Sequence, residues 1–230
     1  MLDRPVRALL APPLAVGGNR LAALGVPPLS LTALGWLLGI GACVAAGFGA
    51  WTAALLLWLS NRLADGLDGP VARAGAPSEF GGFLDIIADF SVYGCFLVGV
   101  AVAEPSARLA ALVLLAMYYV SGSAFLALSS LLERRQVGGD ERSLRFVGGL
   151  AEGTETVIVY VVICLLPGQA ALICWAFAAA VALTAAQRVW MGIKLLCQPG
   201  SELRAPVRQI VPARPRAGTL AGNTRDRSAV

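Results

Sequence analysis

The sequence predicts an all-α integral membrane protein, a bundle of six transmembrane helices with both termini in the cytoplasm. Of its 230 residues, 57% are hydrophobic and only 14% are charged. A soluble domain carries about 25% charged residues, so the composition excludes an ordinary soluble protein. Helices are predicted throughout, because lipid offers no hydrogen-bond partner to backbone N–H and C=O groups. The apolar stretches also lack the alternation of apolar and polar residues that is typical of barrel strands. Six mainly apolar stretches, most of them near the length that crosses a bilayer, cover residues 29–50, 51–65, 82–103, 108–132, 144–166 and 169–196.

The elements follow in order from the N-terminus. Residues 1–28 form a cytoplasmic juxtamembrane lead with three arginines, which Pro5, Pro12 and Pro13 interrupt. Two structures are compatible with this segment: a short helix that lies at the membrane interface, or a disordered lead. The second stretch is short as an apolar run, and we expect its helix to continue through Asp68 toward Arg73. Gly75 and Pro77 then turn the chain, so that the third span returns antiparallel beside the second.

The domain division follows from the second half of the chain. Residues 136–141 form a polar loop between the fourth and fifth spans. Beyond residue 197 the content of Pro, Arg, Gly and Ser rises and the apolar periodicity ends. We therefore expect one six-helix transmembrane catalytic domain at residues 29–197 and a disordered basic cytoplasmic tail at residues 198–230.

The arginines indicate how the bundle is oriented. They lie before the first span, between the fourth and fifth spans and in the tail, whereas the opposite loops hold only Arg108. Cytoplasmic loops carry such an excess of positive charge, so both termini and the aspartate-rich connection are predicted to face the cytoplasm. The net charge of +4 reflects this bias and affinity for anionic membrane lipids. No nucleic-acid partner is expected, and a chain rich in Arg and nearly free of Lys suggests a bacterial inner membrane.

The numbers of cysteines and histidines limit the possible chemistry. The five cysteines are scattered without paired spacing, which favours small apolar core residues over disulfides or metal ligands. The chain has no histidine, which excludes histidine–zinc sites, a Ser-His-Asp triad and a phosphohistidine intermediate. Any general base must therefore be a carboxylate, Lys, Tyr or Cys.

Four aspartates lie where a membrane protein ordinarily holds none. Asp65 and Asp68 are spaced i, i+3, and Asp85 and Asp89 are spaced i, i+4. On helices, each pair shares one face at a separation of about 5–6 Å. Two such faces turned toward each other would present four carboxylates to one small volume. Ionisable groups at this depth are costly unless compensated, so they indicate a functional site that holds hard divalent cations.

Glycines and an arginine surround these carboxylates. Gly69 and Gly81 have no side chain and permit a bulky ligand close to the backbone. Arg73 adds a permanent cation suited to a phosphate oxygen. Together these residues describe a site for a metal-bound pyrophosphate. The alternative is a structural one, in which the aspartates cap helices or pair with Arg62 and Arg73.

This arrangement resembles the CDP-alcohol phosphotransferase family, whose motif reads D-x-x-D-G-x-x-A-R, a spacer, and G-x-x-x-D-x-x-x-D. The matching positions here are Asp65, Asp68, Gly69, Ala72, Arg73, Gly81, Asp85 and Asp89. Two departures occur. The spacer between Arg73 and Gly81 is one residue shorter than the usual form, and Leu29 follows Pro28 where many relatives have Asn.

The resemblance implies a six-helix membrane enzyme, a homodimer, that displaces CMP from a CDP-linked alcohol by the hydroxyl of a second alcohol. Two ions of Mg²⁺ or Mn²⁺ are implied, one bound by Asp65, Asp68 and Asp85, the other by Asp68, Asp85 and Asp89. Asp89 would also be the catalytic base that takes the proton of the acceptor. The residues implied to lie against the CDP group are Gly69, Ala72, Arg73 and Gly81.

Selectivity for the acceptor must come from the second half of the chain. Glu152 and Glu155 are spaced i, i+3 near the start of the fifth span. They are candidates to bind hydroxyls of the acceptor, or else to pair with Arg145, Arg188 or Lys194. The arginines of the loop between the fourth and fifth spans either bind a phosphate of the acceptor or only set the orientation; they are Arg134, Arg135, Arg142 and Arg145.

The leading functional prediction is a transferase of phospholipid biosynthesis that moves a phosphatidyl group from CDP-diacylglycerol to a small alcohol. An ion-coupled transporter is the alternative from another class, but the acids cluster at one mouth of the bundle instead of spanning it. A choline- or ethanolamine-type phosphotransferase, with diacylglycerol as acceptor, is a further alternative. A catalytically silent scaffold is disfavoured by the intact set of four aspartates.

Overall fold

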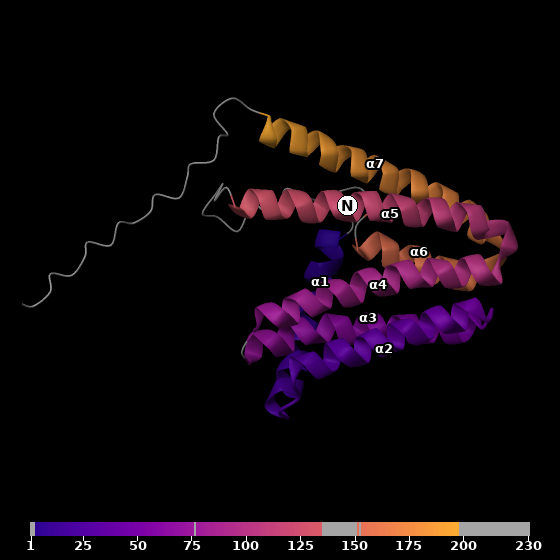
Figure 1. Cartoon of the computed structure of the whole chain (residues 1–230). Helices are drawn as coiled ribbons and strands as arrows, with labels where there is room; N and C mark the ends of the chain where they lie inside the picture. Colours follow the sequence, from indigo (N-terminus) through magenta and orange to yellow (C-terminus); the bar gives the residue numbers. More distant parts are fainter. Residues whose placement is uncertain (1–2, 76, 135–150, 152, 198–230) are drawn as a thin grey trace, which may run out of the picture.

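The computed structural model describes residues 3–75, 77–134, 151 and 153–197, and within these ranges every regular element is helical. Short 3-10 turns at Pro105–Ala107 and Pro167–Gln169 lead into α5 and α7. The α-helices are α1 (Asp3–Ala23), α2 (Pro28–Gly47), α3 (Trp51–Ala74), α4 (Glu79–Ala103), α5 (Arg108–Arg134), α6 (Gly153–Leu165) and α7 (Ala170–Leu196) (Figure 1).

The predicted class, an all-helical integral membrane protein, is confirmed. Among the described residues, four helical segments are long and apolar enough to cross a membrane: Pro28–Gly47, Glu79–Ala103, Pro105–Leu132 and Pro167–Leu196. The helix α3 is long enough but its second half is charged, and α6 is a shorter apolar helix of 13 residues. The predicted fifth span, 144–166, begins outside the described residues.

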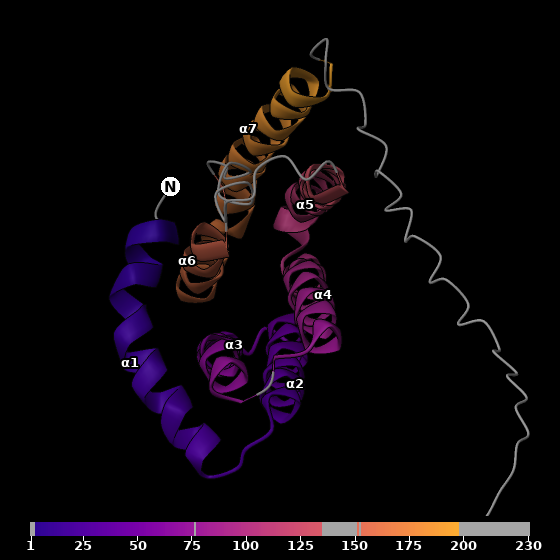
Figure 2. The ribbon, with the colours of Figure 1, turned by 90° about the vertical axis from the view of Figure 1, so that its left-hand side faces the viewer.

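The helix α3 continues past the aspartates, as the sequence predicted. It ends at Ala74, where Gly75 caps it, and α4 starts after Ser78. The two helices do not pack broadly on each other. Both pack on α2 (Figure 2). Aromatic rings bridge the space between them, since Trp58 of α3 has its ring centroid 6.0 Å from that of Tyr93 and 5.5 Å from that of Phe96, both on α4. On the other side of the bundle α5 packs on α7, with α4 touching α5 and α3 touching α6.

The N-terminal lead forms the helix α1, from Asp3 to Ala23, and is not a disordered segment over these residues. The helix α1 continues through Pro12 and Pro13, although each proline removes a backbone donor. It packs along α3. Gly18 permits this contact, because a Cβ atom there would collide with Pro70, and a Cβ at Gly17 would lie 3.0 Å from Leu67. The helix α1 thus supports the turn of α3 that holds the aspartates.

Aromatic rings fill the core beside that turn. Trp58, Phe96 and Tyr160 are fully buried. The rings of Phe96 and Tyr160 stack with centroids 4.4 Å apart, and Trp58 lies 5.0 Å from Tyr160. The Tyr160 hydroxyl donates to the Tyr93 carbonyl at 2.7 Å. This cluster joins α3, α4 and α6, and so fixes the distance between the two helices that bear the aspartates.

The crossing of α2 and α4 depends on a glycine. A Cβ atom on Gly99 would lie 2.5 Å from the Cys43 carbonyl oxygen, which belongs to the backbone of α2 and cannot move independently. We expect Gly99→Ala to force the helices apart and to lower the free energy of unfolding by about 1–3 kcal/mol. Thermal unfolding in detergent measures this, with Gly94→Ala as the matched control on the same helix, because a Cβ there meets Leu115 at an ordinary 3.5 Å. Equal melting temperatures for the two variants would contradict the prediction.

Candidate metal and active site

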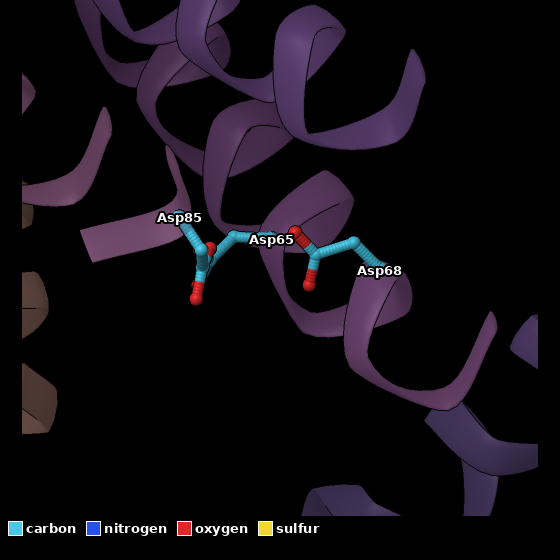
Figure 3. Close-up of side chains that lie close together, drawn as sticks. All are labelled: Asp65, Asp68 and Asp85. Carbon is cyan, nitrogen blue, oxygen red and sulfur yellow. The ribbon is translucent and has the colours of Figure 1, made fainter. Parts of the chain in front are cut away.

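Three of the four predicted aspartates meet in a cluster. Asp65 and Asp68 project from α3, and Asp85 projects from α4 (Figure 3). One carboxylate oxygen of each lies within 4.8 Å of the others. Asp68 is buried, with 9% of its surface exposed, while Asp65 and Asp85 are half-buried. The helical spacing thus brings carboxylates from two helices to one point, as the sequence predicted.

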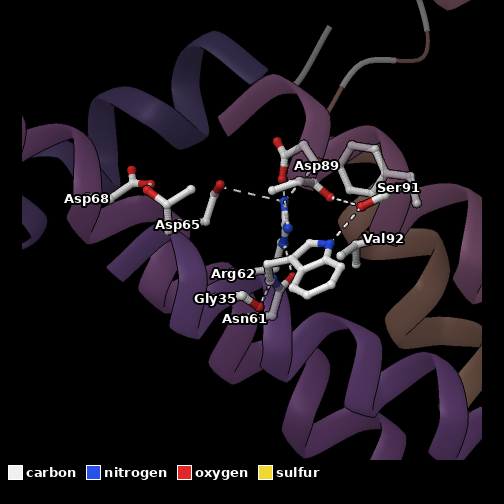
Figure 4. A network of polar contacts seen from close by, with 12 residues as sticks. Gly35, Asn61, Arg62, Asp65, Asp68, Asp89, Ser91 and Val92 are labelled. Carbon is white, nitrogen blue, oxygen red and sulfur yellow. Dashed lines mark hydrogen bonds and ion pairs between the residues drawn. The ribbon is translucent and has the colours of Figure 1, made fainter. Parts of the chain in front are cut away.

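The fourth aspartate lies beside this cluster and has a different partner. Asp89 Oδ1 accepts a hydrogen bond from Arg62 Nη2 at 2.9 Å (Figure 4). Arg62 Nη1 also lies 3.6 Å from Asp65 Oδ2. All four carboxylates nevertheless line one small pocket, which is completed by Thr32, Gly35, Trp36, Asn61 and Ala88.

The helix α2 supplies contacts that the sequence analysis missed. Thr32 Oγ1 donates to Asp68 Oδ2 at 3.0 Å and so orients the buried carboxylate. Asn61 Nδ2 donates to the Gly35 carbonyl at 2.7 Å, which ties α3 to α2 one turn before Asp65. Gly35 and Gly39 are small residues four positions apart, and this spacing was an unused indication that α2 packs closely on its neighbours. Nothing in the sequence indicated which polar groups would meet there.

Of the two arginines considered as partners of the aspartates, Arg62 pairs with Asp89 and Asp65. Arg73 lies elsewhere, in the last turn of α3, where it is exposed. A Cβ atom on Gly69 would lie 3.3 Å from Arg73 Nη1, so the guanidinium occupies the clearing that Gly69 provides.

The other residues implied to bind CDP lie at the same end of the pair of helices. Ala72 is in the last turn of α3, and Gly81 is in the first turn of α4. Ser78 caps α4, since its Oγ accepts a hydrogen bond from the Gly81 amide at 3.0 Å. The shortened spacer thus still ends in a capped helix, and it leaves Asp85 and Asp89 on the face that meets α3.

Of the two predicted acceptor residues, the structure describes only Glu155. Glu152 is outside the described residues. Glu155 is half-buried in the first turn of α6 and is not among the residues that line the aspartate pocket. Beside it, the hydroxyl groups of Thr156 and Tyr118 share a hydrogen bond of 2.8 Å. Of the four loop arginines, Arg135, Arg142 and Arg145 are outside the described residues and Arg134 is the last residue of α5.

The donor set fits a divalent cation. The carboxylate oxygens of the three aspartates are the ligands that Mg²⁺ and Mn²⁺ prefer. Three carboxylates at this separation repel one another unless a cation lies between them. Thr32 holds one ligand in place through a hydrogen bond, as supporting groups do in metal sites. The cluster can therefore bind a metal and, through it, phosphate oxygens.

Comparison with known proteins decides the class of the chain. Residues 26–190 match the family described as CDP-alcohol phosphatidyltransferase. The chain belongs to this family. It is therefore a membrane transferase of phospholipid synthesis, and the predicted resemblance and enzyme class are confirmed.

Two relatives illustrate the range of the family. Inner membrane protein YnjF of Escherichia coli K12 is 38% identical over 196 residues, which cover 84% of this chain and 95% of that protein. The bifunctional IPC transferase and DIPP synthase of Archaeoglobus fulgidus is 30% identical over 146 residues, 61% of this chain but only 28% of that longer protein.

Solved structures show the same fold. Phosphatidylinositol phosphate synthase (PgsA1) of Mycobacterium tuberculosis with CDP-DAG bound has a TM-score of 0.67 and 21% identity, with 82% of this chain and 96% of that chain covered. Its complex with manganese and citrate has a TM-score of 0.65 and 22% identity, with coverage of 82% and 91%. At these identities the likeness establishes the fold.

Proposed function

We propose that the chain transfers a phosphatidyl group from CDP-diacylglycerol to the hydroxyl of a small alcohol and releases CMP. The observation that supports this most directly is the meeting of Asp65, Asp68 and Asp85 in one cluster, in a member of this family. The donor is suggested by the structural neighbour that holds CDP-DAG. Two ions of Mg²⁺ or Mn²⁺ would be held by Asp65, Asp68, Asp85 and Asp89, and the neighbour with manganese supports this choice of metal.

The reaction balances with the groups present. The hydroxyl oxygen of the acceptor forms a bond to the phosphorus that bears the diacylglycerol. The bond from that phosphorus to the bridging oxygen of the pyrophosphate breaks, and CMP leaves with the bridging oxygen and its electron pair. Asp89 takes the proton of the acceptor as general base. The bound cations, when present, neutralise charge on the phosphate oxygens and on the leaving CMP.

The remaining predicted residues are proposed to bind the donor. The guanidinium of Arg73 is exposed above Gly69 and is placed to bind a phosphate oxygen of the donor. Ala72 and Gly81, with a methyl group and no side chain, would lie against the cytidine. We place these residues on the cytoplasmic side of a bacterial inner membrane, in a homodimer whose protomers each have six spans. We also propose that residues 29–197 form the catalytic domain.

A direct assay tests the proposal. The purified protein in lipid nanodiscs, with Mg²⁺ or Mn²⁺, is given CDP-diacylglycerol and one candidate acceptor at a time: glycerol-3-phosphate, inositol phosphate or serine. We expect CMP release with at least one acceptor, together with the matching phospholipid by mass spectrometry. Turnover of CDP-choline with diacylglycerol, and none of CDP-diacylglycerol, would instead assign the choline-type reaction.

Glu155 provides a test of the acceptor site. We expect Glu155→Gln to raise the KM for the acceptor about tenfold and to leave the KM for CDP-diacylglycerol unchanged, since a hydrogen bond to a charged group contributes ~1.5–3 kcal/mol. Glu152→Gln is expected to act in the same way. Glu104→Gln is the control, because Glu104 follows the C-terminal end of α4, whereas Asp85 and Asp89 lie in the N-terminal half of that helix. Unchanged acceptor kinetics in both variants would remove these residues from the acceptor site.

A further inference from the structure

Arg62 is a cation built into the site, although the family motif does not include it. It lies one helical turn before Asp65, and only 12% of its side chain is exposed. Its guanidinium donates hydrogen bonds in three directions: Nε to Asn61 Oδ1 at 2.7 Å, Nη1 to the Tyr93 hydroxyl at 2.9 Å, and Nη2 to Asp89 Oδ1 at 2.9 Å. These partners lie on both helices that bear the aspartates.

The surroundings fix the guanidinium in this position. It lies over the ring of Trp58 at 4.8 Å and near the ring of Tyr93 at 5.1 Å. Both contacts favour a cation. Asn61, which accepts from Nε, is itself anchored to the Gly35 carbonyl of α2 (Figure 4). Arg62 is therefore held by three helices, and it does not depend on Asp89 alone for its place.

This placement divides the four aspartates into two groups. Asp65, Asp68 and Asp85 share a volume that can hold a cation, whereas Asp89 faces a cation that the protein already supplies. Asp65 belongs to both groups, because its Oδ2 is 3.6 Å from Arg62 Nη1. A divalent ion at the three-aspartate cluster meets little competition, but an ion that uses Asp89 competes with the guanidinium for the same carboxylate.

We propose that Arg62 is a positioning residue that acts as a fixed counter-cation and makes the site bind its divalent ions in order. The first ion binds at Asp65, Asp68 and Asp85, and the second binds more weakly because Arg62 neutralises Asp89. Arg62 also keeps the Asp89 carboxylate aimed at the pocket before the substrates arrive. This inference rests on the proposed metal site.

The ordered binding is tested by titrating the full chain in nanodiscs with Mn²⁺ in the absence of substrates. Binding is followed by calorimetry or by the electron paramagnetic resonance signal of free Mn²⁺. The wild-type chain is expected to show two unequal binding equilibria. Arg62→Gln removes the competing charge and is expected to tighten the weaker equilibrium by about tenfold, within the usual range of coupling between sites. Arg62→Lys keeps the charge and is expected to bind like the wild type. Arg108→Gln is the matched control, since Arg108 donates to the Ala101 carbonyl at the far end of α4.

The outcomes separate this inference from the proposed function. A wild-type chain that binds no Mn²⁺ would overturn the proposed metal site itself. Two equal equilibria in the wild type would overturn the ordering, and this result needs no variant. A weaker equilibrium with the same affinity in Arg62→Gln as in the wild type would show that Arg62 only supports the fold. Arg62→Met serves if the glutamine variant does not fold, because its flexible apolar side chain can fill the space beside Trp58.

Discussion

Asp68→Asn is expected to abolish Mn²⁺ binding and CMP release together. Asp68 is the buried member of the three-aspartate cluster, and the amide removes its charge while keeping its shape. Thr32 Oγ1 can still donate to the amide oxygen, so we expect the fold to persist. Changes to groups that merely support metal ligands cost about 10–100-fold in affinity, and the loss of a ligand should cost at least as much. Mn²⁺ titration and the CMP assay measure both effects.

Glu104→Gln is the control for this variant. It also removes one carboxylate from the chain, but at the residue that follows α4 at the end remote from Asp85. We expect its Mn²⁺ affinity and turnover to match the wild type. An Asp68→Asn chain that melts at the wild-type temperature and still binds Mn²⁺ with wild-type affinity would place the metal elsewhere.

The sequence was sufficient for features that depend on local periodicity. The spacing of Asp65 and Asp68, and of Asp85 and Asp89, determines which helix face holds each carboxylate, whatever the helices pack against. The low fraction of charged residues predicted the membrane class, since composition also does not depend on how the helices pack. The extension of α3 to Ala74 followed from Gly75 and Pro77, the residues that end helices and turn the chain.

Features that depend on the crossing of helices could not be predicted. Thr32 is 36 positions from Asp68, and they meet only because α2 packs against both α3 and α4. The pairing of Arg62 with Asp89 was open in the sequence, since Arg73 was an equal candidate by charge. The structure distinguishes them by burial: the guanidinium of Arg62 stacks on Trp58, whereas Arg73 remains exposed.

Asp89→Asn is expected to lower the rate of CMP release by about 10²–10⁴-fold, the contribution typical of a general base. The amide cannot accept the proton of the acceptor hydroxyl. Its oxygen can still accept the hydrogen bond from Arg62 Nη2, so the guanidinium should keep its place. Binding of the first Mn²⁺ ion should be preserved, because Asp65, Asp68 and Asp85 are intact. The rate is measured with the donor and acceptor both saturating.

Saturation with Mn²⁺ separates the two roles that Asp89 can have. If Asp89 acts only as a ligand of the second ion, then a high concentration of Mn²⁺ should fill the weakened site and restore the rate of Asp89→Asn. If Asp89 is the base, the rate stays low however much Mn²⁺ is bound, because the missing proton acceptor is not replaced. Full turnover of the variant at ordinary Mn²⁺ would show that another group takes the proton, and with no histidine in the chain that group would be sought first among the carboxylates of the same pocket.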